Sequence, residues 1–125
     1  MGKVLLVGLG GFLGSIARYL LGGLIARTNQ NIPLPVETLV INVLGCLLLG
    51  FLAGLAEFRG FFSPETRVFF FIGILGGFTT FSTFGYESIQ LFRDGQQGLG
   101  WINVGLQVFL GLGGTWLGIT LSRMV

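Results

Sequence analysis

The residues that could do chemistry in this sequence are few, and almost all of them lie inside long apolar stretches. They are Arg18, Asn42, Thr79, Thr80, Ser82, Thr83, Glu87, Asn103, Gln107 and Thr115. Polar groups inside a membrane span are costly, and they usually face protein or a water-filled path. The chain has no His, and Cys46 is its one Cys. A His-based catalytic dyad, an intrachain disulfide and a Cys/His metal cage are therefore excluded.

The polar residues are most closely spaced in the block GGFTTFSTF, residues 76–84. Its two glycines and three threonines have low helix propensity, so the block predicts a break in a membrane helix. A broken helix within the bilayer is tolerated only where it is buried in protein or lines a cavity. The carbonyls that a break frees are hard oxygen ligands, which suit a small cation.

Two aromatic residues in this block, Phe81 and Phe84, are three positions apart and so share one helix face. An aromatic ring carries a partial positive charge at its edge. Two such edges can stabilise a small anion weakly without water. The alternative interpretation is that the two rings only pack in the core.

Amide and hydroxyl groups occur in two other apolar stretches. Asn42 is either an amide donor to an anion or a partner in an interhelical hydrogen bond. Asn103, Gln107 and Thr115 are spaced i, i+4 and i+12, which places them on one helix stripe, with Gly111 between them. A stripe of neutral donors suits the path of a small anion, whereas a proton or cation relay needs acidic residues. The alternative is a simple interface between helices.

Arg18 and Glu87 are the charged residues near the ends of their apolar stretches. An arginine at the mouth of a pore raises the local anion concentration. The two residues could also form a salt bridge, or Arg18 could extend its charge to the membrane surface.

The composition of the chain is that of a membrane protein, so we expect membrane helices to position these polar residues. Hydrophobic residues make up 52% of the 125 residues and charged residues only 10%, whereas soluble domains have about 25% charged residues. Stretches of about 20 apolar residues predict membrane helices. The stretches of this length are residues 4–26, 36–56, 68–92 and 99–121. We expect a single all-α domain over residues 1–125, rather than an N-terminal signal peptide. The net charge of +2 without a basic cluster argues against nucleic acid as a partner.

Glycine is abundant within these stretches, with 23 residues in the chain. Each stretch contains two glycines four residues apart, which lets two helix backbones approach closely. We expect the following pairs to be packing surfaces: Gly10/Gly14, Gly50/Gly54, Gly73/Gly77 and Gly114/Gly118.

The basic residues divide almost equally between the two sides of the membrane. The side of the termini carries Lys3, Arg59, Arg67 and Arg123, and the other side carries Arg18, Arg27 and Arg93. Basic residues set the orientation of membrane proteins. The near balance predicts either insertion in both orientations, with antiparallel pairing of two copies, or one orientation set by a small bias.

The ordered motifs resemble those of fluoride channels of the Fluc type, also called CrcB. They are GGFLGSIARY at residues 10–19, TLVINVLG at residues 38–45 and GGFTTFSTFGYE at residues 76–87. The resemblance covers the whole chain and implies a passive, fluoride-selective channel in the bacterial inner membrane that exports fluoride and protects the cell from its toxicity. It also implies a dual-topology antiparallel homodimer of four-helix chains, with a break in each third helix.

The family's functional residues map onto most of the polar residues above. The resemblance implies pore roles for Asn42, Phe81, Phe84, Ser82, Thr83, Asn103, Gln107 and Thr115, and vestibule roles for Arg18 and Glu87. It further implies a structural Na⁺ at the dimer centre, bound by backbone carbonyls of Gly76 and Thr79. Gly111 departs from the family, because it stands where some members have a hydroxyl group on the fourth helix.

Two other classes of protein could have this general organisation. A small multidrug exporter also has four spans and balanced charge, but it needs a carboxylate in the first span, where this chain has none. A non-transporting assembly subunit would explain the glycine faces but not the ordered polar block. The sequence contains no nucleophile–base pair, so we do not expect an enzyme.

Overall fold

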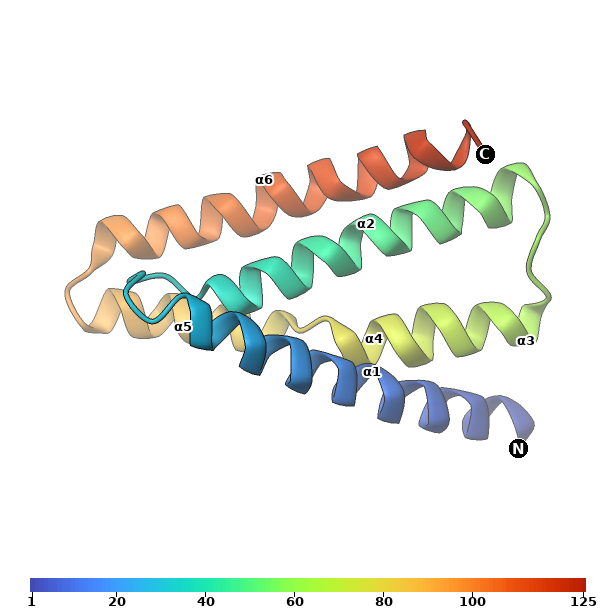
Figure 1. Ribbon diagram of the computed structural model, residues 1–125, viewed down its shortest axis with the longest axis horizontal. Helices are drawn as coiled ribbons and strands as arrows, with labels where there is room; N and C mark the ends of the chain where they lie inside the picture. The colour runs from blue at the N-terminus through green and yellow to red at the C-terminus, as the bar shows by residue number, and fades with distance from the viewer.

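The computed structural model describes all residues from Met1 to Val125 and is entirely helical (Figure 1). Four stretches of helix are long and apolar enough to cross a membrane. This confirms the expected class of fold, and the observed ends lie within a few residues of those expected. The elements are α1 (Gly2–Thr28), α2 (Val36–Phe58), α3 (Pro64–Arg67), η1 (Val68–Leu75), α4 (Gly76–Phe78), α5 (Phe81–Arg93) and α6 (Gln97–Ser122).

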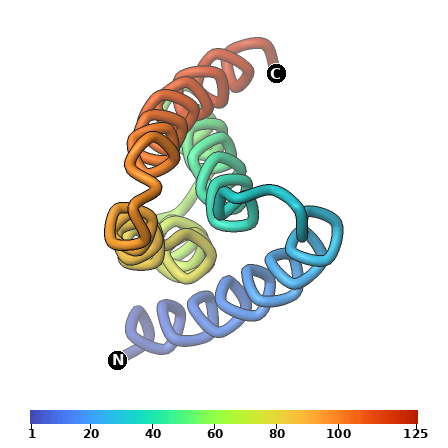
Figure 2. The backbone as a smooth tube through the Cα atoms, turned by 90° about the vertical axis from the view of Figure 1, so that its left-hand side faces the viewer, coloured from blue at the N-terminus to red at the C-terminus, as the bar shows by residue number.

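The helices pack mainly in two pairs. Helix α1 lies against η1 and α4 of the third span, and α2 lies against α6 (Figures 1 and 2). Helix α5 also contacts α6, which joins the two pairs. Both termini lie at the same end of the bundle, as four consecutive spans require (Figure 1).

Glycines make these pairs close, as the spacing predicted. A Cβ atom added to Gly10 would lie 2.8 Å from the Cα atom of Gly73, and one added to Gly77 would lie 3.0 Å from the Cα atom of Gly11. In the other pair, Gly50 faces the backbone of Thr115 in the same way. Backbone therefore contacts backbone along both pairs, which maximises van der Waals contact where lipid provides no hydrophobic driving force.

The third span begins with a capped turn and contains the expected break. Ser63 caps α3 by accepting a hydrogen bond from the Thr66 backbone N–H at 3.2 Å. The break lies at Thr79 and Thr80, whose φ and ψ angles of −85°, 158° and −150°, 114° are extended. Helix α5 restarts there, because the Thr80 hydroxyl accepts from the Thr83 backbone N–H at 3.3 Å.

The π-helical geometry of η1 was not expected from the sequence. Its residues, VFFFIGIL, form an apolar run with no local signal for a wider helix. Such segments inside α-helices are rare and often accompany functional sites. Here the π-helix ends next to the short α4 and the break, so the third span departs from regular α-helix over two adjoining regions.

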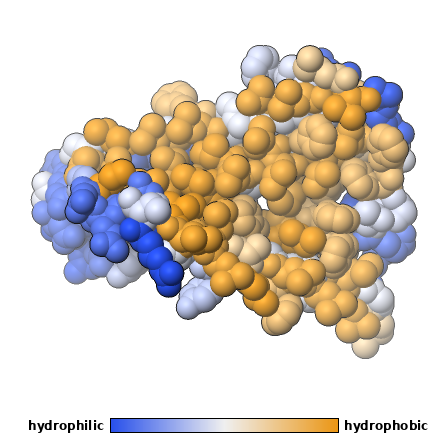
Figure 3. Space-filling model, viewed as in Figure 1, coloured by the Kyte–Doolittle hydropathy of each residue, from blue (hydrophilic) through white to orange (hydrophobic).

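Apolar side chains cover most of the surface and few are buried. Figure 3 shows a broad hydrophobic region between two polar ends. The buried hydrophobic side chains are only Ile41, Ala56, Leu75 and Phe78. A single chain therefore has a small core, and its exposed apolar faces must contact lipid or another protein.

A pair of Gly→Ala substitutions on α1 tests the packing role of the glycines. A Cβ atom on Gly10 would lie 2.6 Å from the Phe69 carbonyl oxygen, whereas one on Gly8 meets nothing within 4 Å. We expect Gly10→Ala to lower the free energy of unfolding by about 1–3 kcal/mol, the usual cost of overpacking. Gly8→Ala should leave it unchanged or raise it slightly, because alanine favours helix. Unfolding in mixed detergent measures both variants, and equal stability of the two would contradict close packing at Gly10.

Candidate functional site

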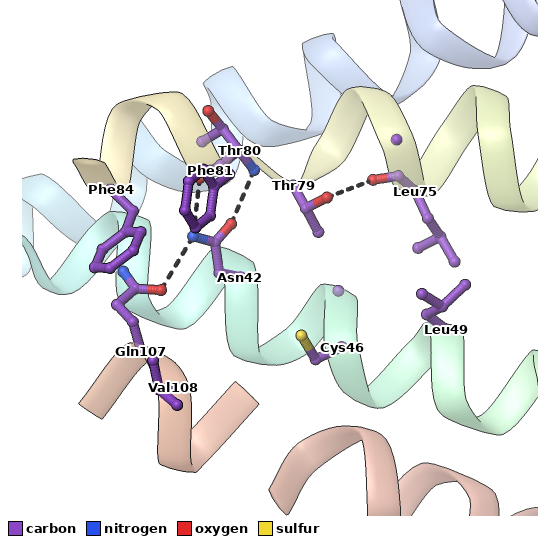
Figure 4. Close-up of a pocket in the computed structure, with 12 residues that line it drawn as sticks. Asn42, Cys46, Leu49, Leu75, Thr79, Thr80, Phe81, Phe84, Gln107 and Val108 are labelled. Atoms are coloured by element: carbon purple, nitrogen blue, oxygen red, sulfur yellow. Dashed lines mark hydrogen bonds between the residues drawn. The ribbon is translucent and has the colours of Figure 1, made fainter. Parts of the chain in front are cut away.

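Asn42 of α2 holds the break in the third span by two hydrogen bonds to one residue. Its Oδ1 atom accepts from the Thr80 backbone N–H at 2.9 Å, and its Nδ2 atom donates to the Thr80 carbonyl oxygen at 3.1 Å (Figure 4). An unpaired backbone group in hydrocarbon costs several kcal/mol. One side chain therefore satisfies both backbone groups that the extended conformation of Thr80 leaves without a helical partner.

The same amide also contacts α6. Asn42 Nδ2 donates a second hydrogen bond to Gln107 Oε1 at 3.1 Å. Gln107 is only 9% exposed, and its Nε2 atom is buried with no hydrogen-bond partner. Asn42 thus links three spans at the break.

A pocket of about 300 Å³ lies beside these hydrogen bonds, between α2, α6 and the broken third span (Figure 4). It brings together six of the predicted site residues, which are Asn42, Gly76, Thr79, Phe81, Phe84 and Gln107. Thr80 and Cys46 also line it, although the sequence analysis gave them no role in the site. The helical stretch before the break thus contributes its end to the pocket, and the stretch after the break contributes two rings.

The rings of Phe81 and Phe84 lie edge to face. Their centroids are 5.4 Å apart and their planes meet at 67°. Phe84 is partly buried, whereas Phe81 is 82% exposed. The two rings therefore form one wall of the pocket, and Phe81 extends beyond the chain's own packed surface.

A second, larger pocket of about 820 Å³ lies between α1, the start of α2 and α5. Arg18, Glu87 and Thr83 line it, and Thr80 lines both pockets. The Glu87 carboxylate accepts a hydrogen bond from the Thr38 hydroxyl at 2.8 Å, rather than from Arg18, and its Oε2 atom is buried without a partner. The two pockets therefore share Thr80 as a lining residue, and we call the larger one the outer pocket and the smaller one the inner pocket.

The remaining predicted site residues do not line the inner pocket. Asn103 is 1% exposed and donates to the Ser88 hydroxyl at 3.0 Å, which fastens α6 to α5. The Thr115 hydroxyl donates to the Gly111 carbonyl of its own helix. Ser82 is exposed, and its hydroxyl oxygen lies 3.2 Å from that of Thr80. Of the three polar residues on the α6 stripe, only Gln107 reaches the pocket, and the other two take part in helix packing or bonding.

Sequence reasoning missed the contribution of Thr80 to the site. Its hydroxyl caps α5, its N–H and carbonyl both bind Asn42, and it lines both pockets. Threonine is a favoured N-cap residue, so Thr80, directly after a run with low helix propensity, could have been identified as the start of a new helix. No comparable signal identifies Ser88 or Thr38 as the partners of Asn103 and Glu87.

The sequence of this chain matches a known family of proteins. Residues 5–119 match the family described as "CrcB-like protein, Camphor Resistance (CrcB)". The chain is 45% identical over 124 residues to a protein of Methylobacillus flagellatus named "Fluoride-specific ion channel FluC", covering 99% of this chain and 97% of the relative. A protein of the same name from Nitratidesulfovibrio vulgaris is 45% identical over 125 residues, covering 100% of both chains. The chain therefore belongs to the CrcB-like protein family.

Proposed function

We propose that this protein is a fluoride-selective anion channel that lets fluoride leave the cell passively across the inner membrane, in which it is a multi-pass protein. The observation that carries the proposal is the mid-span pocket, where two phenylalanine rings and two amides meet at a helix break. The relatives named as fluoride-specific ion channels support the same function.

The two pockets suggest how an anion would enter and be dehydrated. Arg18 in the outer pocket attracts anions to the entrance. From there the anion passes Thr83 and Thr80 into the inner pocket, where it meets the edges of Phe81 and Phe84 and the amides at the break. Ring edges and neutral donors stabilise an anion only at short range. Close approach favours the smallest halide, because selectivity in channels depends on pore size and on the donors that replace water.

The direction of transport follows from the membrane potential. Fluoride enters cells as neutral HF, which dissociates inside and leaves the anion trapped. A potential of 100 mV, negative inside, favours the exit of one negative charge by about 2.3 kcal/mol. A passive pore is therefore sufficient for export, and no covalent chemistry is needed.

A second copy of the chain would complete the pore. Phe81 is 82% exposed and the inner pocket is open, so one chain provides only part of a wall. The near-equal division of basic residues supports a partner of opposite orientation. We therefore place two copies in an antiparallel homodimer.

The helix break also fits a structural Na⁺. The carbonyls of the last turn before a helix end lack intrahelical partners. Gly76 begins the three-residue α4, with which the helix ends, Thr79 follows it directly, and both line the pocket. Hard oxygen atoms of this kind suit a small cation. In the dimer, carbonyls from both copies would hold the ion, whose charge would attach the two broken helices to each other.

Fluoride release from liposomes tests the function. Purified protein should release fluoride rapidly and chloride negligibly once a potassium ionophore balances the charge, without ATP or a proton gradient. A fluoride electrode and a chloride electrode measure both ions, with protein-free liposomes as the control. Equal release of the two ions, no release, or release that requires a proton gradient would contradict a fluoride channel, and the last result would favour an exporter.

Replacement of the aromatic rings tests their contact with the anion. Phe81→Ile and Phe84→Ile keep apolar bulk but remove the positive ring edge. We expect fluoride release to fall at least about tenfold, which corresponds to a barrier about 1.4 kcal/mol higher. Phe109→Ile is the matched control, because Phe109 is exposed on α6 and lies outside both pockets. Unchanged release in the two pore variants would mean that the rings only pack.

Removal of Na⁺ tests the proposed ion and the dimer together. In Na⁺ at 100 times its dissociation constant, the bound ion would stabilise the dimer by about 2.7 kcal/mol. We therefore expect the dimer to dissociate more readily after exchange of Na⁺ for N-methylglucamine, measured by light scattering in detergent. A dimer of equal stability in both solutions would contradict the ion site, and a monomer in both would contradict the dimer.

A further inference from the structure

Three arginines from three parts of the chain lie around the last turn of α2, at the end of the bundle that carries both termini (Figure 1). Arg67 of α3 donates from Nη2 to the Ala56 carbonyl oxygen at 3.1 Å. Arg123, directly after α6, places its guanidinium carbon 4.8 Å from the centre of the Phe58 ring. Arg59 follows α2 as its C-cap residue. We call Arg59, Arg67 and Arg123 the arginine cluster.

The contacts within the chain leave most of the hydrogen-bonding capacity of this cluster unused. An arginine has five N–H donors, and the bond of Arg67 to Ala56 uses one of them. The carbonyls at a helix C-terminus attract cations, which accounts for the position of Arg67. Arg123 and Phe58 form a cation–π contact, which needs no carboxylate partner. All three arginines are exposed, so their remaining donors are accessible from outside the chain.

The charge at the two ends of the bundle is unequal. The end with the cluster has four basic and two acidic residues, which are Lys3, Arg59, Arg67, Arg123, Glu57 and Glu65. The opposite end has three of each kind, which are Arg18, Arg27, Arg93, Glu37, Glu87 and Asp94. Glu57 and Glu65 are exposed too, so they lower the positive charge of the first end without cancelling it. An excess of positive charge at a membrane surface attracts anionic lipids.

Exposed phenylalanines beside the cluster place it where hydrocarbon meets lipid headgroups. Phe58 precedes Arg59 and Phe61 follows two residues later, and these rings are 41% and 68% exposed. Such rings are stable in the outer hydrocarbon of a bilayer, and α2 ends here after 23 mainly apolar residues, the length of a membrane span. At this level the anions next to the arginines are lipid phosphates. A planar guanidinium matches a phosphate and binds it by two parallel hydrogen bonds.

We infer that the arginine cluster binds the phosphate groups of anionic phospholipids, such as phosphatidylglycerol, at the membrane surface. This goes beyond the proposed channel, because all three arginines lie outside both pockets. An antiparallel partner copy would instead bring its opposite end to this surface, and that end has as many basic as acidic residues. An anionic lipid therefore complements the charge of the cluster better than a second copy does. In the proposed dimer the two clusters lie at opposite membrane surfaces, so lipid is bound in both leaflets.

Native mass spectrometry of the protein in detergent tests this surface. The protein is titrated with phosphatidylglycerol and, separately, with phosphatidylcholine of the same acyl chains, and the bound lipids are counted. We expect the wild type to bind phosphatidylglycerol more tightly. Arg59→Gln and Arg123→Gln should each weaken its binding about fivefold, the contribution of one basic residue near an anionic lipid surface. Arg93→Gln is the matched control and should leave binding unchanged, because Arg93 is exposed at the opposite end of the bundle.

Three results would overturn the inference. They are equal binding of the two lipids, equal losses in the cluster variants and in Arg93→Gln, and displacement of phosphatidylglycerol by an equal concentration of inorganic phosphate. A weaker dimer with unchanged lipid binding in Arg59→Gln and Arg123→Gln would assign the cluster to a partner copy, and it too would overturn the inference. The outcome is independent of the channel: a protein that binds phosphatidylglycerol through these arginines but releases no fluoride would support this inference and contradict the proposed function.

Discussion

In hydrocarbon, every backbone N–H and carbonyl must have a partner, and this constraint governs the third span. The chain is extended at Thr79 and Thr80, so the helical ladder is interrupted at mid-span. Asn42, on the neighbouring helix α2, satisfies both backbone groups of Thr80 by hydrogen bonds. These bonds satisfy the backbone at the break, and the pocket lies beside them, lined by residues on both sides of the break.

The glycine contacts give this interruption a rigid frame. Gly10 and Gly73 bring α1 against η1, and Gly50 brings α2 against α6, in each case with backbone against backbone. Packing of this kind replaces the hydrophobic effect, which does not act between helices in lipid. The break therefore follows directly after the closely packed contact of α1 with η1 and α4, and it faces Asn42 on α2 of the other pair.

The sequence predicts the features that depend on composition or on local propensity. Span positions, close glycine pairs and the break follow from long apolar runs and from the residues of the GGFTTFSTF block. Helical spacing indicates a shared face but does not indicate the partner of each polar group. The Thr115 hydroxyl thus bonds to its own helix, and Asn103 bonds to Ser88. Asn42 and Thr80 are 38 residues apart in the sequence. Their pairing depends on how the helices pack, so local sequence does not identify it among the several polar groups of the chain.

The same bonds that stabilise the break also orient the two amides that line the pocket. A backbone carbonyl and N–H set the direction of one amide, and that amide sets the direction of the next. The inner pocket is lined by no charged residue. Its ring edges and amide groups are the neutral groups that we propose contact an anion. An arginine in the inner pocket would hold an anion too firmly for passage, whereas neutral donors and ring edges bind an anion weakly enough to release it. The charged Arg18 instead lines the outer pocket, where we propose that it attracts anions without holding them in the inner pocket.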